Sequence, residues 1–468
     1  MIEMVGLFGL GLSLILLMTL AYRGASVIVL APLLAMLAVT FSMEMPLLAA
    51  YTQIFMPALG RFVARYFPLF LLGALFGKLV DESGCSTSIA NKISTRLGKR
   101  HAVLSVVICA AILTYGGVLV FIVAFAIYPL ARSVFQSADI PRRLIPGAIV
   151  LGSSTFTMTS LPGSMQIQNL IPMPYFKTTA FAAPLLGLVG GSCTFVLGML
   201  WLNHRARAAA RNSEGFATMA GYGPGSDPRA AEDSIAPSPP FFLAIILVAC
   251  APVCNFIFAE IWIPSWNTEY LANERYGGVS LTDVRGIWSS VMALLVSCGL
   301  LIAFSPRCRQ RISEIMTTAA VDSLPPIFNT ASEVGYGATV AALPAFAVIK
   351  NSLLNFVPSN PLISEAATIS VLAGISGSAS GGLSIALESL GATYYQRAIE
   401  SGISPEIMHR IASMASGGLD DLPHNGSVIT LLIVCGLTHK QSYVDIGVVS
   451  IVVPTISLAL AIGIASFF

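Results

Sequence analysis

Two short polar stretches interrupt a largely apolar chain, and they contain the side chains best suited to binding an ion. The first, residues 153–169, reads SSTFTMTSLPGSMQIQN, with hydroxyls before a Leu-Pro-Gly break and amides after it. Such a break ends one half-helix and starts another, which leaves backbone N–H groups free to bind an anion. The alternative is that the hydroxyls bond carbonyl groups of their own helix. We expect an anion site that includes Thr159, Ser160, Gly163, Ser164, Gln168 and Asn169.

The second stretch, residues 413–430, reads SMASGGLDDLPHNGSVIT and gathers Asp420, Asp421 and His424 between apolar runs. Neighbouring carboxylates raise each other's proton affinity, and an imidazole titrates near neutral pH. We therefore expect this cluster to couple a proton to the anion, unless the break lies at a water interface, where charges are cheap. The polar residues directly after the cluster are expected to contact the anion: Asn425, Gly426 and Ser427.

Two glycine-rich segments resemble the tips of helical hairpins, near residues 115–117 and 374–384. Glycine permits the backbone turns and close approaches that such tips need. We expect both segments to line the anion site, through Tyr115, Gly116, Gly117, Ser380, Gly381 and Gly382. Glu388, which follows the second glycine pair, is a further candidate for proton coupling, and Glu333 is another lone charge in an apolar region.

The overall composition indicates that lipid surrounds most of the chain. Of its 468 residues 55% are hydrophobic and 10% are charged, with a mean hydropathy of +0.80, whereas a soluble domain carries roughly 25% charged residues. The net charge of +2 does not suggest nucleic acid as a partner. The first apolar run lacks the basic flank and cleavage site of a signal peptide, so we expect it to be retained. Apolar runs that could cross a bilayer lie near residues 5–22, 25–43, 66–80, 176–202, 240–262, 286–304 and 443–467.

Basic residues predict how the chain crosses the membrane. Lys and Arg cluster after the third, fourth and sixth runs, whereas the connector at 263–283 is acidic. Basic loops stay in the cytoplasm, which places the N-terminus outside the cytoplasm. Residues 203–238, rich in Gly, Pro and Ser, are expected to form a flexible cytoplasmic linker loop. Two membrane units, residues 1–202 and 239–468, are then expected to enter the bilayer in opposite directions.

The two units also share sequence. YGGVLVFIVAF at 115–125 pairs with SGGLSIALESL at 380–390, and a Leu-Pro break follows each at a similar distance. Similar sequence with opposite entry is typical of inverted-topology transporters, in which broken helices from both halves form a midplane site. We therefore expect an all-α polytopic membrane protein with two inverted repeats and re-entrant hairpins. No phosphate loop, HExxH or GxSxG motif occurs, which argues against an ATP-driven pump or a common hydrolase.

Three stretches resemble the gluconate permease family, the gluconate:proton symporters of the ion transporter superfamily: YGGVLVFIVAFAIYP, TSLPGSMQIQNLIP and SGGLDDLPHNGSVITLLIVCGLTHKQSY. The likeness covers essentially the whole chain and is closest to the branch described as 3-hydroxybutyrate permeases. It implies scaffold and transport domains with opposed hairpins, an elevator-type motion, a homodimer and a place in the inner membrane. It also implies symport of a small hydroxy-monocarboxylate with protons. The loop at 203–238 matches no pattern of this family.

The sequence thus predicts a proton-coupled transporter, not an enzyme, that carries a small organic anion such as gluconate or 3-hydroxybutyrate across the lipid bilayer. No cofactor or metal site is expected, although sodium could replace the proton as the coupling ion. Hydroxyl and amide donors suit one carboxylate with hydroxyls, whereas clustered Arg residues would suggest a di- or tricarboxylate. Two alternatives remain: a sodium-coupled di- or tricarboxylate carrier, and an anion channel, which needs a continuous pore lined by like groups.

Overall fold

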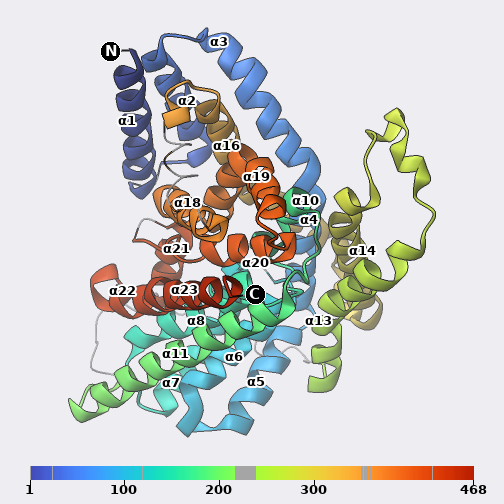
Figure 1. The fold of residues 1–468 in the computed structure, drawn as a ribbon. Helices are drawn as coiled ribbons and strands as arrows, with labels where there is room; N and C mark the ends of the chain where they lie inside the picture. The colour runs from blue at the N-terminus through green and yellow to red at the C-terminus, as the bar shows by residue number, and fades with distance from the viewer. Residues whose placement is uncertain are drawn as a thin grey trace.

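The computed structural model describes residues 2–23, 25–118, 120–216, 239–348, 352, 357, 360–423 and 425–467. Within these residues the regular structure is helical, and Figure 1 shows helices of very different lengths and directions. The predicted all-α class is confirmed, and lipid favours it because a helix satisfies its backbone polar groups within one segment. His424, predicted to couple protons, and residues 217–238 of the predicted linker lie outside the described residues.

Five helical segments of the described chain are long and apolar enough to cross a membrane: Leu47–Glu82, Pro184–Arg211, Phe241–Ser265, Leu281–Phe304 and His439–Ala465. A sixth candidate span is the pair Cys85–Leu97 and Lys99–Tyr115, which bends by 111° at its break. The first two predicted runs correspond to the shorter helices α1 (Ile2–Tyr22) and α2 (Val27–Ser42). These spans make the chain a multi-pass membrane protein.

The structure differs from the sequence expectation at three helix ends. The run predicted at 66–80 is the second part of a longer helix, α4 (Met56–Glu82), whose first part contains Arg61 and Arg65 and therefore reads as polar. Helix α11 (Pro184–Arg211) begins later than predicted, because the preceding Ala183 has a left-handed backbone. It also continues through residues 203–211, expected to be loop, where Ala and Arg both favour helix.

The helices of the first half of the chain, together with α16, form two groups. Helices α1, α2 and α4 pack against α16 (Ile312–Ala341), and α14 (Leu281–Phe304) packs against α4 and α13 (Phe241–Phe256). Figure 1 shows a second group at the opposite end from α1, α2 and α3 (Leu47–Ala50). It comprises α5 (Cys85–Leu97), α6 (Ala102–Tyr115), α7 (Val120–Ser137), α8 (Ile145–Ser153) and α11.

Polar side chains start four successive helices in the C-terminal part of the chain. Each accepts a backbone N–H of the first turn, as Ser, Asn and Asp do at helix N-termini. They are Asn360 for α18 (Pro361–Ser376), Ser378 for α19 (Ala379–Glu400), Ser404 for α20 (Pro405–Ser416) and Asn425 for α21 (Gly426–Cys435). Helices α22 (His439–Gly447) and α23 (Val453–Ala465) follow. The second of the two predicted polar breaks therefore contains a helix start, at Asn425.

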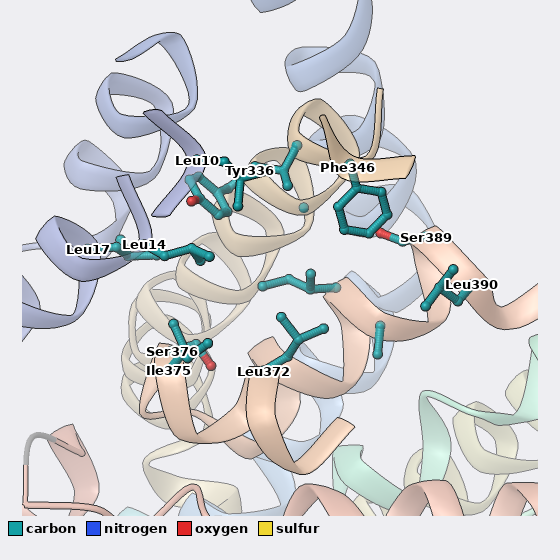
Figure 2. A pocket seen from close by; sticks show the side chains of 14 residues that line it. Leu10, Leu14, Leu17, Tyr336, Phe346, Leu372, Ile375, Ser376, Ser389 and Leu390 are labelled. Carbon is teal, nitrogen blue, oxygen red and sulfur yellow. The ribbon is translucent and has the colours of Figure 1, made fainter. Parts of the chain in front are cut away.

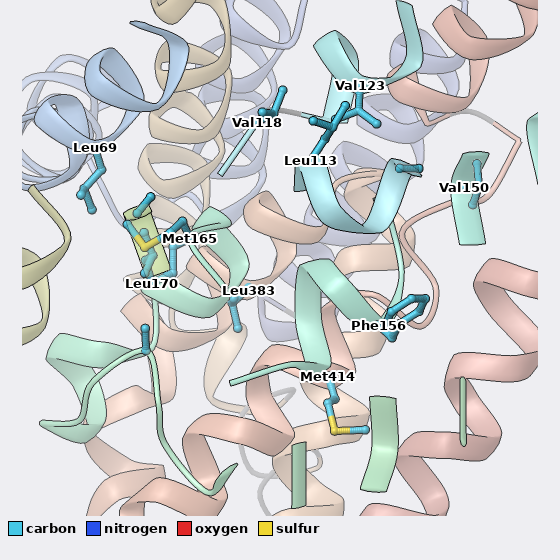
Figure 3. Close-up of a cluster of buried hydrophobic side chains, with 14 of the residues drawn as sticks. Leu69, Leu113, Val118, Val123, Val150, Phe156, Met165, Leu170, Leu383 and Met414 are labelled. Atoms are coloured by element: carbon cyan, nitrogen blue, oxygen red, sulfur yellow. The ribbon is translucent and has the colours of Figure 1, made fainter. Parts of the chain in front are cut away.

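Buried apolar side chains surround the first polar stretch. Figure 3 shows Phe156 and Met165 of this stretch, and Leu170 directly after it, within one cluster that also holds Leu113 of α6 and Met414 of α20. Polar groups placed in such surroundings lose their hydration, so each needs a partner inside the protein. Those partners define the candidate site.

Candidate functional site

The first break lies between α8 and the short helix α9 (Ile167–Leu170), with one π-helical turn, Phe156–Ser160, between them. Most of its predicted anion donors bond the chain itself. Thr159 Oγ1 donates to the Thr155 carbonyl at 3.1 Å, and Ser164 Oγ donates to the Thr157 carbonyl at 2.6 Å. For these hydroxyls the alternative considered from the sequence, satisfaction by nearby carbonyls, describes the structure. Ser160 is buried in the same turn.

Residues after the turn bind the loop that leads into α11. Asn169 Nδ2 donates to the carbonyls of Ser164 and Ala180, both at 2.9 Å. Gly163 has a φ of +77°, which favours glycine, and its N–H also donates to Ala180. Gln168 differs from these residues, because its buried Oε1 has no hydrogen-bond partner among the described residues.

The first hairpin tip is attached to this break. Tyr115 Oη donates to the Pro162 carbonyl at 2.8 Å, and Gln166 Nε2 donates to the carbonyl of Val118 at 3.0 Å. Helix α6 ends at Tyr115, and Gly117 turns the chain with a φ of +108°. Gly116 lies against Val248 of α13, where a Cβ would overlap the valine side chain. The break predicted at this glycine pair is confirmed.

Arg410 of α20 is the site residue that sequence reasoning missed. Its side chain is fully buried, and its guanidinium donates to the Asn169 Oδ1 and the Ala182 carbonyl, both at 2.8 Å. Longer bonds reach the carbonyls of Ala180 at 3.3 Å and Thr159 at 3.4 Å. No salt bridge of Arg410 occurs within the described ranges, so its acceptors are neutral oxygens. A buried positive charge with no carboxylate partner attracts an anion.

Other residues of α20 face the same break. His409 contacts the Thr178 hydroxyl through Nδ1 at 2.6 Å and the Asn169 carbonyl through Nε2 at 3.1 Å. Ser413 Oγ donates to the Thr159 carbonyl at 2.8 Å, and Gly417 lies against the Thr159 side chain. The signal in the sequence was the adjacent basic pair His409 and Arg410, which lies far along the chain from the basic loops.

The second break contains two buried carboxylates. Asp420 is 3% exposed and Asp421 is 2% exposed, and one oxygen of each has no hydrogen-bond partner in the described part of the chain. Asn425, predicted to contact the anion, instead caps α21. Its Oδ1 accepts from the backbone N–H of Ser427 at 2.6 Å and of Val428 at 3.1 Å, while its Nδ2 donates to the Asp420 carbonyl at 3.0 Å.

A small pocket joins the two breaks. Asp421 and Ser427 line it from the second break, and Ser153 and Ser154 line it from the end of α8. Its volume, about 10 Å³, is the space of about one water molecule, so the conformation is closed to a larger ligand. The adjoining Gly426 faces open space. Thr159 and Asn169 contact α20 instead of this pocket.

The second hairpin tip lies within the predicted segment, residues 374–384. Gly377, with a φ of +64°, ends α18, and Ser378 starts α19. Gly381 and Gly382 are therefore inside the first turns of α19, where a Cβ would overlap the Glu333 carboxylate and the Ala373 backbone, respectively. Ser380 Oγ lies 3.3 Å from the Thr330 hydroxyl of α16.

Glu388, the further coupling candidate, has partners on two other elements. Its Oε2 accepts from the Tyr175 hydroxyl of α10 (Met173–Phe176) at 2.9 Å, and its Oε1 lies 3.5 Å from Arg61 of α4. It is part of this side-chain network rather than of the pocket at Asp421.

Several apolar spans, two broken segments and buried polar side chains at both breaks define a membrane transporter. The chain belongs to the GntP permease family, because the model described as "GntP family permease" matches residues 4–327. It is also 42% identical over 448 residues to a Bacillus subtilis protein named "Uncharacterized transporter YxjC", a match that covers 94% of this chain and 95% of the relative. The predicted family and the prediction that the chain is not an enzyme are thus confirmed.

A solved structure supports the fold. The YdaH transporter of Alcanivorax borkumensis, described as having an unusual topology, matches with a TM-score of 0.54. The match covers 88% of this chain and 87% of YdaH, at 17% sequence identity. At this identity the likeness concerns the helical architecture alone.

Proposed function

We propose that this protein takes up a small hydroxy-monocarboxylate, such as gluconate or 3-hydroxybutyrate, by proton symport. The observation that carries the proposal is Arg410 of α20, a fully buried guanidinium that binds the first break through neutral acceptors. One uncompensated positive charge suits one carboxylate, because a charge buried in a membrane protein needs a partner of opposite sign. The hydroxyls and amides around Arg410 bond the chain itself in this conformation, so they bind the hydroxyl groups of the substrate only by exchanging these partners.

Proton coupling is assigned to the second break. Asp420 and Asp421 each have an oxygen without a described partner, and Asp421 lines the pocket that Ser153 and Ser154 close from the other side. His424 follows in the same segment. A proton that travels with the anion makes the load neutral, which lowers the cost of crossing a low-dielectric barrier.

We further propose an inverted repeat with an elevator-type motion. Helices α8 and α20 support it, because both have proline in the first turn, end in serine and lead into a break. In this arrangement the group around α4 and α16 serves as scaffold, and the broken helices move with the substrate. A homodimer in the inner membrane, with the N-terminus outside the cytoplasm, completes the proposal.

Uptake by proteoliposomes tests the function directly. We expect gluconate or 3-hydroxybutyrate to accumulate when the outside is made acidic, and not when sodium alone is added outside. Asp421→Asn should abolish this accumulation but retain exchange of labelled for unlabelled substrate. Asp322→Asn, at a half-exposed position paired with Lys78, is the matched control and should behave like the wild type.

Two results would contradict the proposal. Accumulation that follows a sodium gradient would favour the sodium-coupled carrier. Flux that only equalises the two concentrations would favour a channel. Normal pH-driven accumulation by Asp421→Asn would remove the second break from coupling, leaving the function itself intact.

A further inference from the structure

Glu333 of α16 is a buried carboxylate that the proposed function does not use. It is 3% exposed, and its Oε2 has no hydrogen-bond partner among the described residues. The carboxylate lies directly against Gly381, in the first turn of α19, at a place that a Cβ would fill. An unpartnered carboxylate oxygen in such a place is costly when the group is charged.

The carboxylate lies at the N-terminus of α19, which Ser378 caps by accepting from the Gly381 N–H at 3.0 Å. The N-terminus of a helix also carries partial positive charge, which stabilises an anion. The helix N-terminus therefore favours the charged form of Glu333, whereas burial without a hydrogen-bond partner for Oε2 favours the uncharged acid. This mixed environment allows the group to change its charge.

Charged groups on the elements that pack around α16 have partners elsewhere. On α19 and α4, Glu388 pairs with Arg61; Lys78 pairs with Asp322 of α16 itself, and Arg65 of α4 lies beside Tyr66.

At the far end of α16, Arg311 binds Glu82 and Glu314, and Arg307 of α15 (Pro306–Gln310) binds Glu82. Near Glu333 itself, Tyr336 lies one turn farther along α16 and bonds Ser13. Helix α2 contains no titratable side chain. No described cation thus neutralises Glu333.

The surroundings one turn farther along are apolar. Figure 2 shows a pocket between α1, α16, α18 and α19, lined by side chains that include Leu14, Tyr336 and Ile375. Its volume is about 50 Å³, and apolar cavities of this kind stay empty of water. Water therefore does not reach Glu333 from this side while the second hairpin tip stays against α16.

We infer that Glu333 is a proton-binding residue of the transport cycle, in addition to the aspartates of the second break. This inference rests on the proposed proton symport. The proton at the second break balances the charge of the substrate monoanion, and a second proton on the Glu333 carboxylate gives the loaded protein one additional positive charge. The proton comes from the outer solution and leaves to the inner one when the tip of α18 and α19 separates from α16.

Proton uptake on substrate binding tests the inference. Purified protein in weakly buffered detergent solution is mixed with gluconate or 3-hydroxybutyrate, and a pH indicator counts the protons taken up. We expect Glu333→Gln to take up one proton fewer per bound substrate than the wild type and to bind substrate with a weaker pH dependence. Glu365→Gln is the matched control, because Glu365 is also fully buried without a described partner but lies near Tyr394, in the C-terminal half of α19.

The outcomes separate the two proposals. Equal proton uptake by Glu333→Gln and the wild type would overturn the inference, whereas no proton uptake by the wild type would refute proton symport itself. If Glu333→Gln does not fold, Glu333→Asp keeps the acid but withdraws it from Gly381. It should move the pH midpoint of substrate binding, and an unchanged midpoint would equally overturn the inference.

Discussion

At the scale of single residues, Arg410 has the largest set of buried contacts at the candidate site. Its guanidinium joins the first break, and the loop that leads from it into α11, to α20 through carbonyl and amide oxygens. The side chain therefore has two separable roles. It holds the break together, and it supplies the positive charge that the proposed substrate needs.

Substitutions of Arg410 separate these roles. Arg410→Gln leaves buried carbonyls without donors, and we expect the free energy of unfolding to fall by about 2–4 kcal/mol. Gluconate binding, measured by calorimetry, should weaken at least about tenfold, or 1.4 kcal/mol. Arg410→Lys keeps the charge but not the planar fork, so it should lose stability yet retain most of the affinity. A folded Arg410→Gln variant with unchanged affinity would place the anion site elsewhere.

At the scale of elements, Asn425 shows how one side chain positions a helix. Both of its side-chain groups are used locally, since Oδ1 caps α21 and Nδ2 binds Asp420. The cap orients α21, which presents Ser427 and Thr430 to the pocket. A weaker cap therefore changes the pocket indirectly.

A capping role for Asn425 predicts a different result from direct contact between its side chain and the substrate. Asn425→Ala should lower the free energy of unfolding by about 0.5–2 kcal/mol, because it removes the acceptor of the first-turn N–H groups. Asn425→Ser restores an acceptor and should recover most of that loss, together with substrate affinity. Thermal unfolding and calorimetry on the same preparations check both values. Should Asn425→Ser recover stability but not affinity, the amide contacts the substrate after all.

The close contacts of α19 with α16 and α18 are a second example at the scale of elements. Gly381 and Gly382 lie inside the helix and let it approach α16 and α18, while Gly377 makes the turn. A glycine pair in the sequence predicts either a turn or a close approach. The first pair, Gly116 and Gly117, lies at the turn, whereas the second pair serves close packing.

At the scale of the whole molecule, the proposed inversion predicts which loops face the cytoplasm. In a background without the eight native cysteines, we expect a cysteine at Ser226 to react with a membrane-impermeant reagent only after the cells are opened. A cysteine at Asn273, in the exposed connector between α13 and α14, should react in intact cells. Labelling of the Ser226 position in sealed cells would reject the proposed orientation.

Local sequence was sufficient for much of the fold and part of the site. Runs of apolar residues predicted most spans, and the first glycine pair predicted the turn at the end of α6, because both signals depend on neighbouring residues. The missed helix extensions also have a local cause. Arg61 and Arg65 in α4, and the Arg-rich end of α11, are polar in composition but favour helix.

The sequence by itself determined the class of the protein: a helical, multi-pass membrane transporter of the GntP permease family, with two polar breaks in its apolar helices. The tertiary structure alone decided which side chains meet at those breaks. It brought Arg410 to Asn169, Glu388 to Tyr175 and Glu333 to Gly381, pairs that are far apart along the chain or on different helices. The reason is physical: helix formation and capping depend on neighbours within a turn, whereas these contacts depend on how whole helices pack.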